Sequence, residues 1–373
     1  LLTFDIILMR IGIDARFYGK EGKGIGRYTA KLIKYLEEVD QKNDYFIFLR
    51  RNNFDLYKPR HSNFKKVLAD ISWYSFKEQI VFPFILKKYH LDLVHFLHFN
   101  VPLIWRRKFI VTIHDLIHSH TGQQGSTRSA GIYFFKKIAY QLVIKHALRN
   151  SSKIIAVSFA TKEEIKIQFN IEDSKIQVIY EGVEEIAEKE KPIEEVKKPF
   201  LLYIGNAYPH KNLGRLIEAF KLIREKERKI SLVLVGKIDY FYQNWQKIAF
   251  EQKIKDIVFL GQREDEEIKW LYKNSLAYIC PSWEEGFGLP GLEAMFYGTP
   301  VICSKTSSLP EIYGQAAFYF DPGNVQEIAE SILKVWENQD ERKSLIEKGK
   351  EQVKRYSWLN CAQNTQKIYQ EFN

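Results

Sequence analysis

The chain has 373 residues, of which 45% are hydrophobic and 27% are charged. These proportions exclude a disordered or collagen-like chain, and the length predicts two or three domains. A count of 56 Lys and Arg against 46 Asp and Glu gives a formal net charge of +10, which favours an anionic partner: nucleic acid, a membrane surface or a phosphorylated ligand.

The cysteine pattern and the chain start bear on the compartment. Cys280, Cys303 and Cys361 lie far apart and include no C-x-x-C pair, which predicts a reducing cytosolic compartment and neither a disulfide framework nor a zinc ribbon. No apolar run approaches the roughly 20 residues that span a bilayer, so we expect no transmembrane segment. The first eight residues lack the features of a signal peptide, and we expect Met9 to be the natural start.

Short apolar runs alternate with segments of helical period in both halves, which predicts βαβ units and parallel sheets. The strands predicted in the first half are 10–14, 45–49, 92–96, 109–114, 153–157 and 176–180. Those predicted in the second half are 200–204, 232–236, 257–261, 276–280, 301–303 and 318–320. Between them lie predicted helices such as 213–226, which has one apolar stripe.

Residues 184–199 consist almost entirely of Lys, Glu and Pro and are interpreted as a linker. We therefore predict an α/β protein with two doubly wound, Rossmann-like domains, residues 1–183 and 200–356, facing each other across a central cleft. Ligands of such sheets bind beyond the carboxyl ends of the strands, so candidate sites are sought directly after strands.

A glycine-rich segment follows the first predicted strand. Gly22, Gly24 and Gly26 form a loop that opens a helix, and amides near Gly26 are candidates to meet a phosphate. The pattern is neither G-x-G-x-x-G nor a Walker motif, and a flexible loop is the alternative interpretation.

His114 and Asp115 end the strand of VTIHDL, where a histidine can bind a hydroxyl or shuttle charge. Further histidines lie nearby at His95, His98, His118 and His120. Their spacing fits no H-E-x-x-H pattern, and the chain has no Asp-x-Asp pair of the kind that holds a nucleotide through a divalent ion. We therefore predict no metal site.

The chain carries no acidic residue between Asp115 and Glu163. Within this stretch, residues 130–150 mix aromatic and aliphatic side chains with four basic residues. Such a segment suits either a basic amphipathic helix on an anionic membrane or a core helix with a basic outer face.

In YIGNAYPHKN the predicted strand ends, Gly205 turns the chain, and Lys211 precedes a helix for which Asn212 is a candidate cap. A lysine in this place can neutralise a diphosphate leaving group. A solvated lysine at a helix start is the alternative.

The segment PSWEEGFGLPGLEAMFYGTPVICS has the strongest signal. Gly286 and Gly288 allow a tight turn, and Pro290 suits the first turn of a helix whose free amides form an anion site. Glu285 and Glu293 flank this helix start and are candidates for hydroxyl recognition on a sugar and a ribose. The alternative is that Glu293 favours the helix dipole and Glu285 is solvated.

Together these segments resemble the family 4 retaining glycosyltransferases of GT-B fold, from Met9 to the C-terminus. The resemblance rests on GIGRYT, TIHDL, the Lys-Asn of PHKN, EGFGLPGLEAMFYGTPVICS, SLPEIYG and the C-terminal YSW. It implies that a C-terminal helix, 357–373, completes the N-terminal, acceptor-side domain, and that residues 200–356 bind a nucleotide sugar.

The resemblance also implies roles for single residues. As catalytic residues, Lys211 would contact the diphosphate, Glu285 the donor sugar and His114 the transferred sugar. The donor-binding residues that it implies are Gly26, Gly205, Asn206, His210, Gly286, Phe287, Gly288, Leu289 and Glu293. The family often has an arginine where this chain has Asn206 or His210, and Arg215 is a candidate replacement.

We therefore expect a metal-independent, retaining hexosyltransferase that uses a nucleotide diphosphate sugar and no other cofactor. The favoured donor is GDP-mannose, and the expected acceptor is a glycan or a lipid-linked oligosaccharide of surface polysaccharide or O-antigen synthesis. The enzyme would be cytoplasmic, with peripheral contact to the cytoplasmic membrane, and would not bind nucleic acid. A UDP-sugar donor and a nucleotide-sugar epimerase of the same fold are the alternatives, and an inactive glycan-binding relative also remains open.

Overall fold

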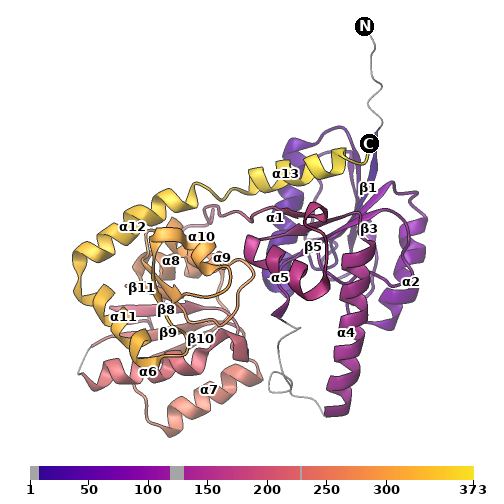
Figure 1. Ribbon diagram of the computed structural model, residues 1–373. Coiled ribbons are helices and arrows are strands. Elements are labelled where there is room, and N and C mark those ends of the chain that lie inside the picture. Colours follow the sequence, from indigo (N-terminus) through magenta and orange to yellow (C-terminus); the bar gives the residue numbers. More distant parts are fainter. Residues whose placement is uncertain (1–7, 118–129, 227–228) are drawn as a thin grey trace. The chain divides into compact units, whose positions relative to one another are not determined.

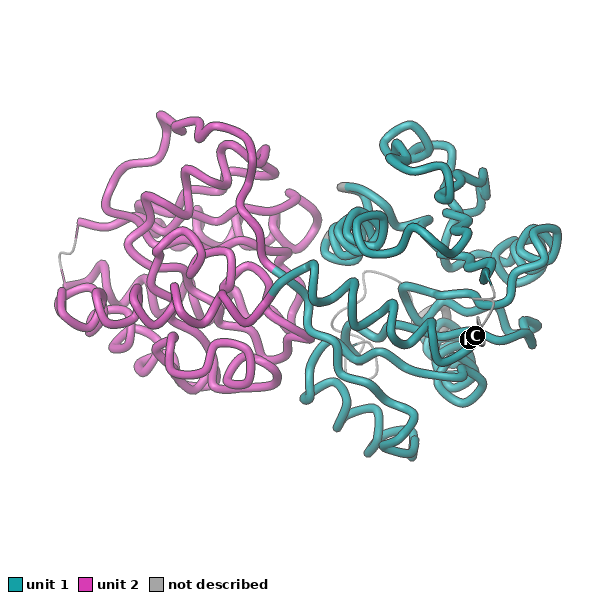
Figure 2. The backbone as a smooth tube through the Cα atoms, turned by 90° about the horizontal axis from the view of Figure 1, so that it is seen from above, with its two compact units in different colours: residues 1–119, 128–182, 357–373 teal, residues 120–127, 183–356 magenta. Residues whose placement is uncertain are grey.

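The computed structural model describes residues 8–117, 130–226 and 229–373. They form two compact units (Figures 1 and 2): unit 1 contains the described residues up to Gly182 and from Ser357 onward, and unit 2 contains Val183–Tyr356. The first seven residues, His118 and His120 lie outside the described residues, so the expectations that involve them stay predictions.

Unit 1 is built on a seven-stranded parallel sheet of order β3-β2-β1-β4-β5-β6-β7. Its strands are β1 (Arg10–Asp14), β2 (Asp44–Leu49), β3 (Phe64–Leu68), β4 (Leu93–Phe96), β5 (Phe109–Ile113), β6 (Lys153–Ala156) and β7 (Ile176–Val178). Its helices are α1 (Lys23–Val39), α2 (Phe76–Lys87), α4 (Ala130–Asn150), α5 (Phe159–Phe169) and α13 (Trp358–Gln370), with short 3-10 turns η1 (Lys20–Gly22) and η3 (Asp173–Lys175).

Helices cover both faces of this sheet, which explains why its central strands, such as β4 and β5, are buried along their whole length. Because side chains alternate along a strand, β4 serves both faces. Val94 and Phe96 pack into the core that α2, α4 and α5 complete, whereas His95 hydrogen-bonds Tyr369 of α13. Helices α13 and α1 pack side by side on that second face (Figure 1), so the end of the chain completes unit 1.

Unit 2 has a six-stranded parallel sheet of order β10-β9-β8-β11-β12-β13. Its strands are β8 (Phe200–Ile204), β9 (Ser231–Val235), β10 (Ile257–Gly261), β11 (Ala277–Cys280), β12 (Val301–Ser304) and β13 (Ala317–Phe320). Its helices are α6 (Leu213–Glu225), α7 (Tyr240–Glu251), α8 (Asp265–Asn274), α9 (Leu289–Phe296), α10 (Leu309–Tyr313), α11 (Val325–Glu337) and α12 (Gln339–Val353), with 3-10 turns η4 (Pro209–Lys211) and η5 (Gly314–Ala316).

The predicted α/β class with two doubly wound parallel sheets is confirmed, but one strand is missing from the prediction. Strand β3, FKKVL, pairs only with β2 and forms an edge of the first sheet. Lys65 and Lys66 interrupt its apolar character because an edge strand is partly solvated and its lysines discourage pairing with other chains. Lys65 forms an ion pair with Asp44 of β2 at 2.9 Å.

The glycine-rich segment also differs from the expected loop. Helix α1 begins at Lys23, so Gly24 and Gly26 lie in its first turn instead of before it. A Cβ atom at Gly26 would lie 2.1 Å from the carbonyl oxygen of Gly19 and 2.5 Å from that of Phe17. Gly26 is therefore required where the helix packs closely against the preceding turn.

Candidate functional site

The strand order of unit 2 places two loops at a topological switch point. Strands β8 and β11 are neighbours and parallel, but the chain leaves β8 toward β9 on one side and leaves β11 toward β12 on the other. In open α/β sheets this point forms a crevice at the carboxyl ends of the strands. The loop after β8 carries Lys211, and the loop after β11 carries Glu285.

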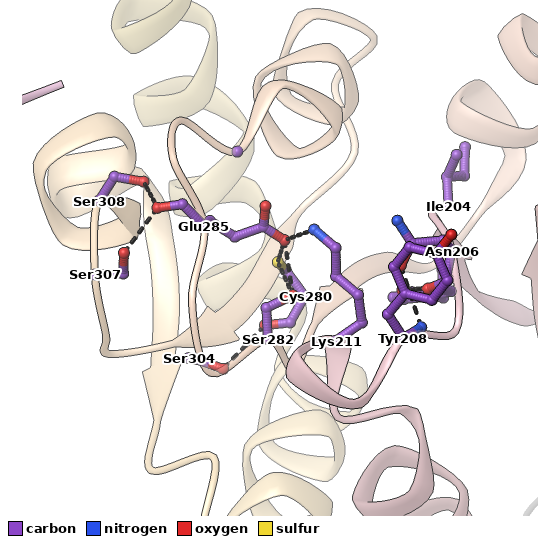
Figure 3. A network of polar contacts seen from close by, with 12 residues as sticks. Ile204, Asn206, Tyr208, Lys211, Cys280, Ser282, Glu285, Ser304, Ser307 and Ser308 are labelled. Carbon is purple, nitrogen blue, oxygen red and sulfur yellow. Dashed lines mark hydrogen bonds and ion pairs between the residues drawn. The ribbon is translucent and has the colours of Figure 1, made fainter. Parts of the chain in front are cut away.

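Lys211 and Glu285 meet across these two loops (Figure 3). The Lys211 Nζ atom lies 2.7 Å from the Glu285 Oε1 atom, and each side chain is 15% exposed. The hydroxyl of Ser282 donates a second hydrogen bond of 2.7 Å to the same oxygen. The pair thus holds a cation and a carboxylate at one site that solvent still reaches.

These contacts set the charge of Glu285. Burial raises the pKa of its carboxyl, but the Lys211 ammonium and the hydrogen bonds from Lys211 and Ser282 outweigh burial, so the pKa lies below its ordinary value. Glu285 is therefore ionised at neutral pH.

The main chain of both loops is held by further hydrogen bonds. The hydroxyls of Ser307 and Ser308 donate to the Glu285 carbonyl at 2.7 and 2.8 Å. Asn212 begins α6, yet its side chain makes no cap hydrogen bond: its Nδ2 donates to the carbonyls of Pro281 and Pro322 at 3.0 and 2.9 Å. The side chain of Asn212 therefore links the loops after β11 and β13 instead of capping α6. The backbone of Asn212 is left-handed, with φ 57°, and this conformation accompanies the orientation of its side chain toward those loops.

Helix α9 begins beside Glu285 as predicted. Gly288 is its first flanking residue, with φ 87°, and Pro290 lies in the first turn. A Cβ atom at Gly291 would lie 2.2 Å from the Tyr313 hydroxyl, which itself donates to the Gly288 carbonyl at 2.5 Å. The amides of Leu289 and its neighbours thus form the start of a helix that favours an anion.

Two of the predicted donor-binding residues in this segment, Glu293 and Phe287, have buried side chains. Glu293 is 5% exposed, and its Oε2 atom accepts a 2.9 Å hydrogen bond from the Tyr272 hydroxyl. Phe287 is 4% exposed and packs edge-on against Tyr356, with ring centroids 5.6 Å apart. A ligand would therefore meet Phe287 through its backbone.

Asn206 and His210 stand where the family often has an arginine, and each makes contacts of its own. The Asn206 side chain accepts a 3.2 Å hydrogen bond from the Tyr208 amide (Figure 3), and the Gly205 amide donates to the Val235 carbonyl at 2.9 Å. The His210 carbonyl accepts from the Trp283 amide at 2.8 Å, which ties η4 to the loop after β11. Arg215 hydrogen-bonds Asn212 at 3.3 Å and lies over the Trp283 ring at 5.2 Å.

His114 lies directly after β5 in unit 1. Its Nδ1 is 3.2 Å from the Glu181 carboxylate, its Nε2 is 3.1 Å from the Leu97 carbonyl, and Tyr28 packs edge-on against the ring at 4.7 Å. Both ring nitrogens therefore lie within hydrogen-bond distance of an oxygen atom.

Of the histidines considered as metal ligands, the structure describes His95, His98 and His114. His95 is fully buried and bonds Tyr369 and Thr112 at 2.7 and 2.8 Å, and burial, aided by the charge of nearby His114, lowers its pKa to about 3. Among the described residues, no group of three or more His, Cys, Asp or Glu side chains is arranged to hold a metal ion. The three cysteines are free and buried.

Helix α4, which contains the basic stretch, is buried in its second half and exposed in the described part of its first half. Its second half packs into the core through Ile144, Ala147 and Leu148. In its first half, residues 134–139 are all exposed, and Phe134 and Phe135 expose 60% and 72% of their surface. Within the described residues, no helix has both the length and the apolar character needed to cross a bilayer.

Several residues that shape the site were missed from the sequence: Ser282, Ser307, Ser308, Tyr272 and Tyr313. Ser282 stands three positions before Glu285, within reach of a local hydrogen bond, and this spacing could have identified it. The others come from separate elements, and no local pattern signals them.

Two family models match the chain in consecutive blocks. The model described as Glycosyltransferase Family 4 matches residues 22–185, and that described as Glycosyl transferases group 1 matches residues 184–352.

Similar proteins include the O-antigen chain mannosyltransferase RfbU of Salmonella typhimurium, 26% identical over 92% of this chain and 95% of that protein. O-antigen chain mannosyltransferase B of Escherichia coli is 36% identical over 46% of this chain and 45% of its own. The structure of Anabaena HepE in complex with UDP-glucose aligns over 97% of this chain and all of that one, with a TM-score of 0.72 and 19% identity. The chain belongs to the family 4 glycosyltransferases, has the GT-B fold and resembles mannosyltransferases.

Proposed function

We propose that this glycosyltransferase moves mannose from GDP-mannose to a hydroxyl of a glycan or lipid-linked acceptor in O-antigen or related surface polysaccharide synthesis. The observation that carries the proposal is the Lys211–Glu285 pair at the switch point of unit 2, beside the start of α9. Mannose is favoured because the relatives reported above are named O-antigen mannosyltransferases, and GDP is the nucleotide expected with it from the sequence.

Lys211 and the α9 amides would bind the diphosphate. When the bond between the anomeric carbon and the diphosphate breaks, the electron pair stays on the phosphate oxygen, and Lys211 would stabilise this charge. The Glu285 carboxylate would give up its contact with Lys211. It would instead accept hydrogen bonds from hydroxyls of the donor sugar. Glu293 would bind the ribose.

We propose that the sugar is transferred with retention of anomeric configuration. The acceptor oxygen would attack from the face that the diphosphate leaves, and its proton would pass to the departing phosphate oxygen. For unit 1 we propose that His114 binds the transferred sugar and that amides near Gly26 bind phosphate, as the family resemblance implies.

We further propose that neither a metal ion nor a resident cofactor takes part. The support is positive: Lys211 and the amides at the start of α9 already provide the charge stabilisation that a divalent ion would supply. Transfer in the presence of excess EDTA tests this directly.

We propose that unit 1, the acceptor-side domain, works at the cytoplasmic face of the membrane. The exposed Phe134 and Phe135, followed by the exposed Lys136 and Lys137, give α4 an apolar and basic surface that suits anionic lipid headgroups.

The test is incorporation of radiolabelled mannose from GDP-mannose into lipids extracted from membranes of the source organism, with EDTA present. An α-linked, lipid-soluble product is expected. A second candidate is glucosyl or N-acetylhexosaminyl transfer from a UDP-sugar, favoured by the UDP-glucose complex of the similar HepE structure. Label incorporated only from a UDP-sugar selects that candidate, and conversion of the donor without acceptor selects an epimerase.

A further inference from the structure

A hollow lies in unit 2 next to the candidate donor site. It has a volume of about 940 Å³ and is formed by η4, the first turn of α6, helix α7 and the loops after β11 and β13. Lys211, Glu285 and the α9 residues do not line it, whereas His210 does. The hollow therefore shares His210, Asn212 and Arg215 with the site described above, but it excludes the Lys211–Glu285 pair and the start of α9.

Two tryptophans form walls of this hollow. Trp245 of α7 lies against α6 so closely that a Cβ atom at Gly214 would be 2.3 Å from its ring. Trp283 exposes 37% of its surface, and a Cβ atom at Gly323 would be 3.4 Å from its ring. Glycine at both positions thus leaves room for flat aromatic surfaces beside the backbone.

Further aromatic rings extend the same lining. Tyr208 and Phe241 pack edge-on with centroids 5.2 Å apart, and Tyr240 packs against Phe241 at 5.5 Å while exposing 65% of its surface. Tyrosine and tryptophan offer both an apolar face and a polar atom to a ligand.

Planar polar groups stand among these rings. Arg215, half-buried over Trp283, and the exposed Glu218 and Asn244 all line the hollow. Such groups hydrogen-bond pairs of neighbouring hydroxyls. The lining includes one arginine, Arg215, and two glutamates, Glu218 and Glu284. It therefore lacks the excess of positive charge that a phosphate or a diphosphate requires.

We propose that this hollow binds a neutral glycan, namely a non-reacting stretch of the acceptor chain. Pyranose rings have an apolar face of C–H groups that packs on aromatic rings and a rim of hydroxyls that planar polar groups bind. The volume lies in the range of about 300–1,000 Å³ typical of small-molecule sites. The identification of this glycan as the acceptor rests on the proposed transferase function. Binding energy from such a distant part of a substrate can be used to position its reacting end.

The test uses isothermal titration of the whole protein, with GDP present, by four neutral tetrasaccharides: α-mannotetraose, maltotetraose, β-galactotetraose and chitotetraose. Binding of at least one is expected. Trp245→Ala should weaken it at least about tenfold, and so should the double variant Glu218→Ala/Asn244→Ala, whose exposed side chains can be removed without opening the core. Phe250→Ala is the matched control, because Phe250 lies on the same helix, is 85% exposed and does not line the hollow.

The outcomes separate this proposal from the proposed function. If the wild type binds no tetrasaccharide, or if the variants bind it as tightly as wild type, the glycan site is refuted. If the variants lose affinity for GDP in parallel, the hollow belongs to the donor site and the proposal is again overturned. GDP titrated alone reports on the donor site, so a failure to bind GDP counts against the proposed function while the tetrasaccharide titrations still decide the glycan site.

Discussion

Lys211 and Glu285 lie 74 positions apart in the sequence, yet the Lys211 Nζ and Glu285 Oε1 atoms are 2.7 Å apart in the folded chain. The Lys211 ammonium helps to keep the Glu285 carboxylate ionised, and each side chain is 15% exposed. A ligand with a diphosphate and a hydroxylated ring can replace both halves of this contact, since phosphate suits the ammonium and hydroxyls suit the carboxylate.

Replacing Lys211 tests its proposed role in leaving-group stabilisation. Lys211→Ala should reduce kcat about 10²–10³-fold, the usual effect of removing one group that stabilises developing negative charge. Lys211→Arg keeps the charge and should retain more activity. Initial rates of mannose transfer measure both, and an alanine variant within about threefold of wild type contradicts the role.

Ser282 is predicted to position Glu285. Ser282→Ala removes one hydrogen bond to the carboxylate and leaves the Lys211 contact, so kcat should fall by about tenfold while affinity for GDP is unchanged. Glu285→Gln should lose more, because the amide replaces the ionised acceptor. A loss of GDP affinity in Ser282→Ala would show that the loop itself has collapsed.

The start of α9 depends on a glycine with positive φ. Gly288→Ala combines strain at φ 87° with a Cβ placed 2.6 Å from the Tyr313 hydroxyl, so we expect a loss of about 1–3 kcal/mol in unfolding free energy and weaker GDP binding. Gly298→Ala is the control: its φ is 76°, but the nearest atom is 3.8 Å away and it follows the other end of α9. It should lose stability without losing GDP affinity, as urea unfolding and calorimetry would show.

The buried His95 should make stability depend on pH. Its pKa is lowered to about 3 by burial, whereas the unfolded value is about 6.5. As pH falls below about 6.5 the unfolded state binds a proton that the folded state does not, so the unfolding free energy should drop by about 1.4 kcal/mol per pH unit. His95→Gln should remove this part of the slope between pH 6.5 and 4.5. His61→Gln is the control, because His61 is exposed and its replacement should leave the hydrogen bonds of His95 to Tyr369 and Thr112 intact. Equal slopes for wild type and His95→Gln would contradict the account.

Helix α4 is predicted to bind anionic membranes. Phe134→Ser/Phe135→Ser and Lys136→Gln/Lys137→Gln should each reduce co-sedimentation with phosphatidylglycerol vesicles about tenfold, and salt should weaken the wild-type interaction. Phe250→Ser removes an even more exposed ring on α7 and should have no effect. Binding that is unchanged in both double variants would assign the membrane contact elsewhere.

Most strands could be predicted because both sheets are buried on both faces, which makes a strand such as 200–204 a continuous apolar run. The edge strand β3 could not, since Lys65 and Lys66 place it among solvated segments. The start of α1 was misplaced for a related reason: Gly24 and Gly26 have low helix propensity, and only the contact with the Gly19 and Phe17 carbonyls explains the glycine at position 26.

At the site, the sequence identified Lys211 and Glu285 separately as residues that follow strands. Their direct contact depends on the pairing of β8 with β11, which no local pattern reveals. The same holds for Tyr313 and Ser308, which reach the site from the segment after β12.

The central claim is that unit 2 binds a nucleotide sugar through Lys211 and the start of α9. The most direct measurement is thermal stabilisation of wild type and Lys211→Ala by GDP, UDP, ADP and dTDP and by their sugar conjugates, with EDTA present. Because a ligand of the native state raises the melting temperature, we predict a selective shift with GDP, a larger one with GDP-mannose, and loss of both in Lys211→Ala. No shift with any nucleotide, or equal shifts in wild type and variant, would contradict the claim.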